Sequence, residues 1–370
     1  MTIFGGLWAA VILVALAWAW TLPYVQQRTI VFGVRIPPER AADPRLRACR
    51  GYYLRAMGVL TLFALSTGTL LGLCRQGAWT FLILFLALYG LWLGVRVQVY
   101  HRLRRMKQEQ GWYTDLHQAI MAEVGGPERP DVFPGAWLAP AGAILFVTLA
   151  IGLRHYPLLP ARVPTNIEQS GRLDTLMPKS LTTAIFGGTF AGQIAILVAV
   201  LLCGWIGFRL RQELDVTAPL ASARQQRRAR LLRARAWLLY GACLELAAGL
   251  LDLSLWGLWP LPRAWVVPMF CGLDLVGAIV FTCFSLWLGP NGSRLRVAFS
   301  ARERVYVNRD DDAYWKGGLL YLNADDSRLW VTDRLGFGPA LNFARPWAWP
   351  MAGVALLVLV VPSIVLSVQG

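Results

Sequence analysis

The chain has 370 residues, of which 56% are hydrophobic and only 15% are charged. Soluble globular domains carry about 25% charged residues, so this composition argues against an ordinary soluble enzyme or binding domain. A net charge of +15 could indicate nucleic-acid binding. Basic loops between apolar runs are explained more simply by membrane topology, and we expect no nucleic-acid partner.

Eight apolar runs are long enough to cross a bilayer as helices, which need about 20 mostly apolar residues. The 17 tryptophans suit such a protein, because this side chain anchors helices at the bilayer interface. The predicted partner of these runs is the lipid bilayer. The runs are approximately Ile3–Leu22, Ala56–Leu73, Trp79–Val97, Trp137–Leu153, Ile185–Phe208, Trp237–Leu258, Trp265–Leu288 and Trp349–Ser367.

The basic residues alternate between the segments that separate these runs. The segments after the first, third, fifth and seventh runs hold 30 of the 36 Lys and Arg residues, with Arg96 counted in the segment that follows its run. Basic loops stay in the cytoplasm, so both termini are predicted outside. The predicted fold is an all-α polytopic membrane protein with about eight transmembrane helices and a small cytoplasmic β-hairpin module before the last helix.

Changes in composition divide the chain into five regions. Residues 1–136 form a three-helix membrane region with Arg-rich loops, and 137–208 form a two-helix unit with an external Pro-rich loop at 154–184. Residues 209–288 hold a basic lead-in and an acidic helix pair, 289–348 form the cytoplasmic module, and 349–370 form the last helix. Within the first region, "KQEQGWYTDLHQAIMAEVG" (107–125) fits a short interfacial helix or a solvated loop.

The external loop at 154–184 has no apolar period, and its prolines favour an extended backbone that holds its shape without a core. Four of the six basic residues predicted outside lie in it, which a plain tether would not need. We therefore expect a shaped surface for a ligand. Its candidate binding residues are Tyr156, Pro157, Pro160, Pro164, Thr165, Asn166, Asp174 and Lys179.

Three carboxylates lie inside apolar runs: Glu245, Asp252 and Asp274. Glu245 and Asp252 are two helical turns apart, so they share a face about 10 Å apart along the axis. The sixth and seventh runs are joined by a short turn and must be antiparallel, which could place Asp274 at the same interface. Acids in hydrocarbon indicate either a proton, cation or amine site, or a structural pair. For Gln193 and the neighbouring "GGTFAG" string, helix packing is the default explanation.

In the region 289–348 the period changes to two, and "GLLYLN" (318–323) and "RLWVTDR" (328–334) are predicted to pair as a hairpin around "NADDS". The acids at 310–312 and 325–326 lack the ligand order of a calcium-binding loop, which favours a solvated acidic turn balanced by neighbouring arginines. The cysteines and histidines have no disulfide or zinc spacing. We expect no metal, no cofactor and no catalytic residue.

Two motifs carry a resemblance to known bacterial membrane proteins. The outer-loop string Tyr156-Pro157-x-Leu159-Pro160-x-x-Val163-Pro164-Thr165, continued by Gly171, Asp174, Lys179 and Ser180, resembles a module of unknown function shared with SdpI-type toxin-immunity proteins. The loop "VFGVRIPPE" (Val31–Glu39) resembles the cytoplasmic loop of the same group. The C-terminal region resembles a second uncharacterised module, which accompanies the first in larger relatives. The residues that carry this resemblance are Asp311, Asp312, Tyr314, Trp315, Lys316, Gly318, Tyr321, Asn323, Val331, Arg334, Gly336, Gly338, Leu341, Asn342 and Phe343.

The resemblance implies a multi-pass protein of the bacterial cytoplasmic membrane with a role in immunity or signalling. Relatives commonly have His after the Pro-Thr pair, where this chain has Asn166, so any proton or metal role of that His is lost or replaced by amide hydrogen bonds.

The sequence leaves several functions open. The first is a non-enzymatic receptor, sensor or immunity-like protein that binds an extracellular peptide or envelope ligand through the Pro-rich loop and reports to a cytoplasmic partner. The second is a proton- or cation-coupled transporter that uses the intramembrane acids. A membrane enzyme and a scaffold are further alternatives, and no catalytic motif is visible.

Overall fold

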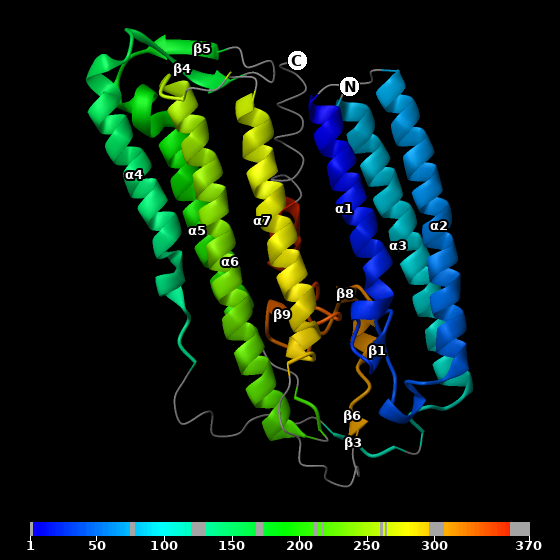
Figure 1. The fold of residues 1–370 in the computed structure, drawn as a ribbon. Coiled ribbons are helices and arrows are strands. Elements are labelled where there is room, and N and C mark those ends of the chain that lie inside the picture. Colours follow the sequence, from blue (N-terminus) through cyan, green and yellow to red (C-terminus); the bar gives the residue numbers. More distant parts are fainter. Residues whose placement is uncertain are drawn as a thin grey trace. The chain divides into compact units, whose positions relative to one another are not determined.

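The computed structural model describes residues 3–74, 78–114, 116–119, 131–167, 173–210, 214–216, 218–259, 262, 265–295 and 307–355. Its framework is α-helical (Figure 1). Among the described residues, the labelled α-helices are α1 (Ile3–Val25), α2 (Pro44–Leu73), α3 (Ala78–Glu109), α4 (Ala139–His155), α5 (Ala191–Arg209), α6 (Pro219–Leu255) and α7 (Val266–Leu288), and residues 348–355 are also helical.

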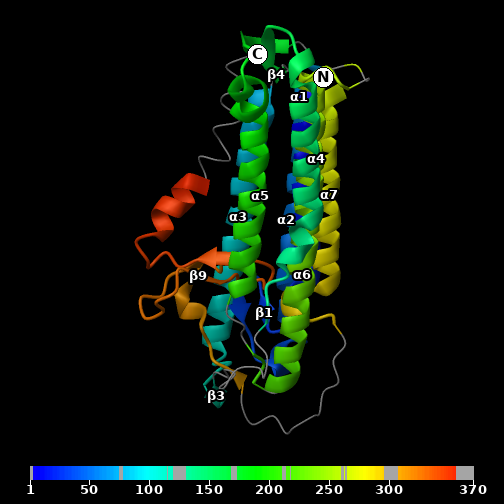
Figure 2. The same ribbon diagram turned by 90° about the vertical axis from the view of Figure 1, so that its left-hand side faces the viewer.

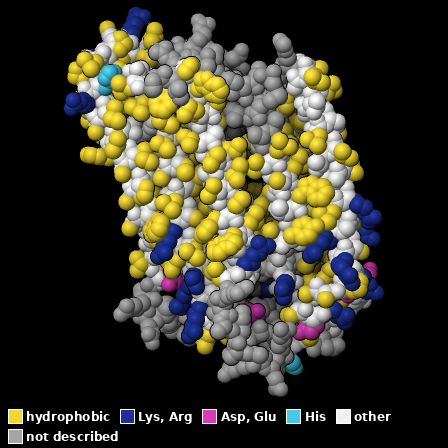
Figure 3. Space-filling view, viewed as in Figure 1, with side chains coloured by type: hydrophobic (Ala, Val, Ile, Leu, Met, Phe, Trp, Pro, Cys, Tyr) yellow, Lys and Arg dark blue, Asp and Glu magenta, His cyan; other side chains and the backbone are white. Residues whose placement is uncertain are grey.

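Six of these helices, α2 to α7, are long and apolar enough to cross a membrane, and α1 adds a further apolar helix. Hydrophobic side chains predominate along the exposed faces of the helices, whereas Lys and Arg gather near helix ends (Figure 3). The protein is therefore a multi-pass membrane protein. The eighth predicted run lies largely outside the described residues, and the position of the termini stays a prediction.

The chain divides into two compact units. Unit 1 comprises Met1–Gly126, Leu210–Gln226 and Gly289–Gly370, and unit 2 comprises Pro127–Arg209 and Arg227–Leu288. Residues 1–126 of the first predicted region and the region 289–348 thus fall in one unit, whereas residues 127–136 fall in the other. The Pro-rich loop and the acidic helix pair fall together in the other.

In unit 1 the helices α1, α2 and α3 pack side by side (Figure 1) around one apolar core. Helix α2 begins where Pro44 occupies the first turn and the Asp43 side chain accepts a hydrogen bond from the Arg45 backbone N–H. Deep in the core, the Tyr53 hydroxyl donates to the Ala19 carbonyl and accepts a hydrogen bond from Trp92 Nε1. These bonds satisfy polar atoms that burial would otherwise leave unpaired.

Short two-stranded pairs, three antiparallel and one parallel, complete the described part of unit 1. Strands β1 (Ile30–Val31) and β2 (Val34–Arg35) form a tight hairpin after α1, and β3 (Gln118–Ala119) pairs in parallel with β6 (Val307–Asn308). In the region 289–348, which is predicted to be cytoplasmic, β7 (Trp315–Lys316) pairs with β8 (Leu320–Tyr321), and β9 (Trp330–Thr332) pairs with β10 (Pro339–Leu341).

These strands correct two sequence-based expectations. The runs 318–323 and 328–334 do not pair with each other, because β8 and β9 each belong to a different hairpin. Within 107–125, the described residues that follow α3 form turns and strand β3, where an interfacial helix was one alternative. Local alternation identifies strands, but their partners depend on contacts that sequence spacing does not show.

Unit 2 contains α4 to α7, with the hairpin of β4 (Arg162–Ile167) and β5 (Leu173–Pro178) at the end of α4 and α5 (Figure 2). We call this β4–β5 pair the outer hairpin, after the orientation that the basic residues predict. Between it and α5 lies η4 (Thr182–Phe190), a π-helical segment that contains most of the "GGTFAG" string. Helix α6 has 37 residues, about 56 Å, so its basic first half extends beyond a hydrocarbon core of about 30 Å.

Candidate functional site

The outer hairpin is the principal candidate site, because its two strands contain four of the eight predicted ligand residues and the other four flank it. Its strands pair antiparallel with Arg162 opposite Pro178, and Pro164 opposite Leu176. The extended geometry expected from the prolines is therefore confirmed for residues 162–167 and 173–178, whereas Pro157 lies in the 3-10 helix η3 (Tyr156–Leu158) and corrects it there. No third described strand joins this sheet.

The register decides which backbone groups face outwards. The Lys179 N–H donates to the Ala161 carbonyl at 2.8 Å, just beyond the paired strands. Hydrogen-bonded and non-hydrogen-bonded residue pairs alternate along an antiparallel ladder. Since residues 161 and 179 form a hydrogen-bonded pair, the pairs 162–178, 164–176 and 166–174 are not hydrogen-bonded, and their N–H and C=O groups point away from the partner strand. Both strand prolines, Pro164 and Pro178, occupy such outward positions, where the missing N–H costs the hairpin nothing.

The two edges of the outer hairpin consequently differ. On β4, Pro164 interrupts the outward row of donors between Arg162 and Asn166. On β5, Asp174 and Leu176 are adjacent outward positions and both retain an N–H. A proline on an edge strand blocks pairing with another chain, and Pro164 lies in the middle of β4 whereas Pro178 is the last residue of β5, so β5 presents the more open edge.

Lys179 fastens the base of the outer hairpin. Its Nζ donates to the carbonyls of Pro157 at 3.0 Å and Leu159 at 2.8 Å, and it lies 5.0 Å from the centre of the Tyr156 ring. Ser180 and Thr183 then exchange hydrogen bonds between side chain and backbone at the start of η4. Polar contacts thus hold both ends of the loop together.

An apolar cluster holds the same loop from below. Leu159, Val163 and Ile185 pack with Trp256, whose Nε1 donates to the Ala184 carbonyl at 2.8 Å. The Trp256 ring lies against Gly152, where an added Cβ would come within 2.5 Å of the ring. The loop therefore packs on a small apolar core, so the expectation that it holds its shape without a core was wrong.

Some of the predicted ligand residues hold the loop in place, and others lie on the paired strands. Lys179 and Tyr156 serve the fastening just described, together with the Pro157 carbonyl. The backbones of Asn166 and Asp174 pair across the hairpin. Exposed apolar side chains on the same loop, which the sequence did not single out, are Leu158, Leu176 and Met177.

The intramembrane acids do not assemble as three. Glu245 lies on the α6 face that meets α5, because Gly241 contacts Val200 and Gly249 lies against Gln193. Asp252 shares that face at 100° per residue, as its spacing predicts.

Asp274 has a different neighbour. It accepts a hydrogen bond from the Tyr240 hydroxyl, and Gly277 of α7 packs against Tyr240 and Cys243. These α6 positions lie roughly opposite Glu245 around the helix. The predicted interface of three acids is therefore replaced by two carboxylates on one face of α6 and a third on the other.

Unit 1 contains a cluster of charged side chains, which is the second candidate site. Arg35 Nε donates to Asp311 at 2.8 Å, and Lys107 Nζ lies 2.6 Å from Asp312 and 2.7 Å from Asp310. We call these residues, together with Arg334, the charge network. Arg334 bonds both Asp311, at 2.5 Å, and Asp312, and its Nε donates to the Gly33 carbonyl at 3.0 Å.

The charge network corrects the expectation of a solvated acidic turn at residues 310–312, although arginines do balance these acids, and Asp325 is exposed as expected. Asp312 is 3% exposed, and Arg35, Lys107 and Arg334 are similarly buried. The three carboxylates lie close enough together to hold a metal ion, with ligand atoms within 4.8 Å of one another. Three cations of the chain already neutralise them, so the geometry is that of a buried structural network.

Burial acts to raise the pKa of Asp311, but the Arg35 and Arg334 guanidiniums outweigh it and hold that pKa well below its usual value. Asp311 is consequently ionised at every pH at which the charge network is intact. The charge of this residue thus fastens the module to the β1–β2 hairpin.

The remaining predicted residues of the module shape its loops. Asn342 is fully buried, and its amide nitrogen donates to the carbonyls of Asn323, Asp326 and Arg328. Trp315 is buried beneath Arg334, whose guanidinium lies 5.5 Å from its ring centre. The other members play smaller parts: Tyr314 and Tyr321 are ring neighbours, Lys316 donates to Ala313, Gly336 has a positive φ, and the Gly338 N–H bonds Asp333.

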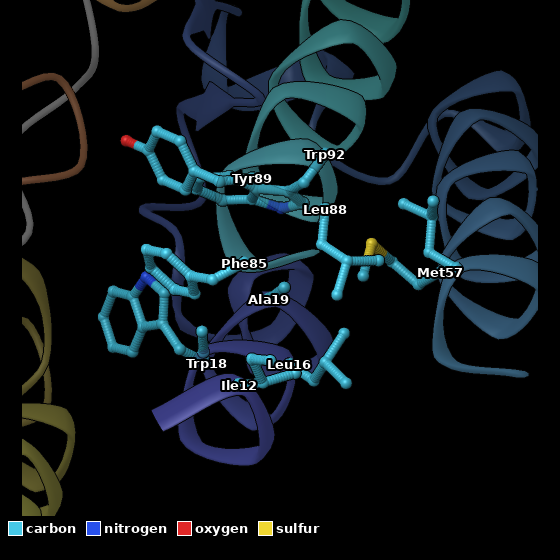
Figure 4. Close-up of a pocket in the computed structure, with 11 residues that line it drawn as sticks. Ile12, Leu16, Trp18, Ala19, Met57, Phe85, Leu88, Tyr89 and Trp92 are labelled. Atoms are coloured by element: carbon cyan, nitrogen blue, oxygen red, sulfur yellow. The ribbon is translucent and has the colours of Figure 1, made fainter. Parts of the chain in front are cut away.

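A cavity of about 230 Å³ lies among α1, α2 and α3 (Figure 4). Aliphatic and aromatic side chains line it, with Phe85, Tyr89 and Trp92 of α3 facing Leu16 and Met57 from the other two helices. It offers no titratable side chain apart from the Tyr89 phenol, so it provides packing space and no catalytic groups.

Several important residues escaped the sequence analysis. Arg35, Lys107 and Gly33 contact the module from positions more than 200 residues away. The only signal was the motif-like "VFGVRIPPE" loop, which contains two of them. Trp256 was counted simply as part of a membrane run.

Compared with known proteins, the chain matches no family model, no curated protein and no solved structure. The resemblance to SdpI-type immunity proteins therefore stays a prediction that rests on the motif residues. The fold itself defines the class as a multi-pass α-helical membrane protein.

Proposed function

We propose that this protein is a membrane receptor or sensor, of immunity-like type, that binds an extracellular peptide at the outer hairpin. The observation that carries the proposal is the asymmetric pair of edges. The β5 edge keeps two adjacent outward N–H groups at Asp174 and Leu176, whereas Pro164 blunts the β4 edge.

An open strand edge selects an extended peptide as ligand. Such a peptide adds a third strand, its main chain gives affinity through hydrogen bonds, and side-chain contacts at alternate positions give specificity. Leu176 and Met177 are about half exposed and supply apolar contacts beside that edge. The loop supports this role because Lys179 and Trp256 hold its base in one geometry, which lowers the entropy cost of binding.

A bound peptide would act on the helices through the segment that follows β5. Ser180 and Thr183 connect the hairpin to η4, which runs directly into α5. π-Helical segments within α-helices are common at functional sites, because their extra residue per turn can be gained or lost by small shifts. In this proposal η4 transmits occupancy of the outer hairpin to α5, and the module 289–348 reports to a cytoplasmic partner.

The proposal places the protein in the bacterial cytoplasmic membrane with the outer hairpin outside. Support for this orientation comes from the basic residues, 30 of which lie in the alternate segments predicted to be cytoplasmic.

The test uses the full chain in lipid nanodiscs and a displayed library of short unstructured peptides. Peptides selected on the wild type are then measured against two matched variants. Leu176→Pro removes an outward N–H from β5, whereas Asn166→Pro removes one from the already blunted β4. We expect Leu176→Pro to weaken binding about tenfold or more, and Asn166→Pro to leave it unchanged, since a lost hydrogen bond costs about 1 kcal/mol and the proline ring adds a clash. Failure to select any peptide, or equal binding by Leu176→Pro, would contradict the proposal.

A further inference from the structure

Two fully buried polar side chains in unit 2 have no hydrogen-bond partner among the described residues. Both carboxylate oxygens of Glu245 and both amide atoms of Gln193 are unpaired, and each residue is 0% exposed. Buried polar groups are nearly always paired in native proteins, so four unpaired atoms on one pair of helices call for an explanation.

The two side chains belong to one interface. Gly249 of α6 allows Thr148 of α4 and Gln193 of α5 to approach the helix closely. A Cβ at Gly249 would lie 2.8 Å from Thr148 Oγ1 and 3.5 Å from Gln193 Nε2. One turn from Gly249, Glu245 lies between this point and the contact of Gly241 with Val200. Asp252, on the same α6 face, is 2% exposed.

We call Asp252, Thr148, Gln193 and Glu245 the polar track. The polar track begins at Asp252, near the C-terminal end of α6, which leads into the turn predicted to lie outside. It continues past Thr148 and Gln193, at the level of Gly249, to Glu245. The two carboxylates are about 10 Å apart along the helix axis. A row of this kind within one helix interface resembles the acid and amide chains that carry protons in membrane proteins.

No cation on the packed elements can neutralise Glu245. Helix α4 has no Lys, Arg, Asp or Glu before Arg154, and α5 has none before Arg209. On α6 the nearest arginine is Arg235, about 15 Å away along the axis and stacked on Trp137. Asp274 of α7 and its partner Tyr240 lie on the opposite side of α6.

We propose that Glu245 is an intramembrane proton-binding site and that protons reach it from the outer end along the polar track. An unpaired carboxylate ion in hydrocarbon is costly, whereas the protonated acid is neutral and gains a donor that a neighbouring amide or water oxygen can accept. Binding forms one O–H bond at a Glu245 oxygen and breaks one O–H bond of a hydronium ion from the solvent, which becomes water. This site is independent of peptide binding at the outer hairpin, and either proposal can fail without the other.

Infrared spectroscopy of the full chain in nanodiscs tests the site, because a protonated carboxylic acid has a C=O band that a carboxylate lacks and that shifts in D₂O. At neutral pH we expect the wild type to show such a band and Glu245→Gln to lose the part due to one acid. Absence of the band in the wild type, an unchanged band in Glu245→Gln, or its removal by Na⁺ at constant pH would overturn the proton site.

The rate of the D₂O shift tests the route. Asp252→Asn and Gln193→Leu should each slow exchange at Glu245 several-fold, whereas Asp274→Asn, on the far side of α6, should leave its rate unchanged. Exchange as fast in Asp252→Asn as in the wild type would overturn the route along the polar track. Peptide binding measured on Glu245→Gln should stay intact, which separates this result from the function of the outer hairpin.

Discussion

Gly33 and Gly318 touch through their backbones: a Cβ added to Gly33 would lie 2.7 Å from the Gly318 Cα. Both glycines have positive φ, 86° and 68°. The contact brings the β1–β2 hairpin onto the module of residues 307–348, and it leaves room for no side chain.

Replacement of Gly33 by Ala should therefore destabilise unit 1. The left-handed backbone alone costs about 1–2 kcal/mol for a residue with a Cβ, and the clash with Gly318 adds to it. We expect a lower thermal midpoint in nanodiscs, followed by tryptophan fluorescence. Gly338→Ala is the matched control, since nothing lies within 4 Å of its added Cβ; an equal loss in both variants would contradict the contact.

Asp312→Asn should be the most damaging conservative change in the charge network. The substitution removes the carboxylate charge that pairs with Lys107 and Arg334, two buried cations, so the network is left with more positive than negative charge. Breaking a buried pair by removing one partner costs about 3–5 kcal/mol. Asp325→Asn, at an exposed position of the same module, should have almost no effect. Limited proteolysis of 307–348 would measure the difference, and similar digestion of both variants would refute a structural role for the network.

The same network predicts acid sensitivity. The pKa of Asp311 is lower in the folded state than the unfolded value of about 3.9, so its stabilisation is complete above about pH 4 and is lost as the pH falls towards the folded pKa. Wild type and Asp311→Asn should thus differ in thermal midpoint at pH 7 and converge below pH 4. A difference that stays constant with pH would show that the Asp311 charge does not act in this way.

Lys179→Met should make the loop more mobile without changing the packing of an apolar core. The variant keeps the length of the side chain but loses two hydrogen bonds, from Nζ to the Pro157 and Leu159 carbonyls, worth about 1–3 kcal/mol for a charged donor. Hydrogen exchange in 156–181 should become faster while exchange in α7 stays the same. Arg162→Met offers a control on the same loop; if both variants behave alike, Lys179 does not fasten the base.

The membrane runs were predictable because hydrophobicity and length alone define them. The seventh run was predicted at 265–288 and the helix is Val266–Leu288. Helix α6 begins much earlier than its apolar run, at Pro219, because the Arg, Ala and Leu residues of the basic lead-in are good helix formers.

Tertiary partners were not predictable in the same way. Arg35 and Asp311 are 276 positions apart, and no local pattern relates them. Asp274 was placed on the wrong side of α6 because the rotation of α7 depends on Gly277 packing against Tyr240. Trp256 appeared only as one more apolar residue, although its Nε1 fixes the start of η4.

Strand addition at the outer hairpin is the central claim, and amide hydrogen exchange at single-residue resolution tests it most directly. With a selected peptide bound, the account predicts slower exchange at the outward N–H groups of Asp174 and Leu176, and little change at Thr175, which already faces β4. Protection confined to other parts of the protein, or none at Asp174 and Leu176 despite binding, would contradict it.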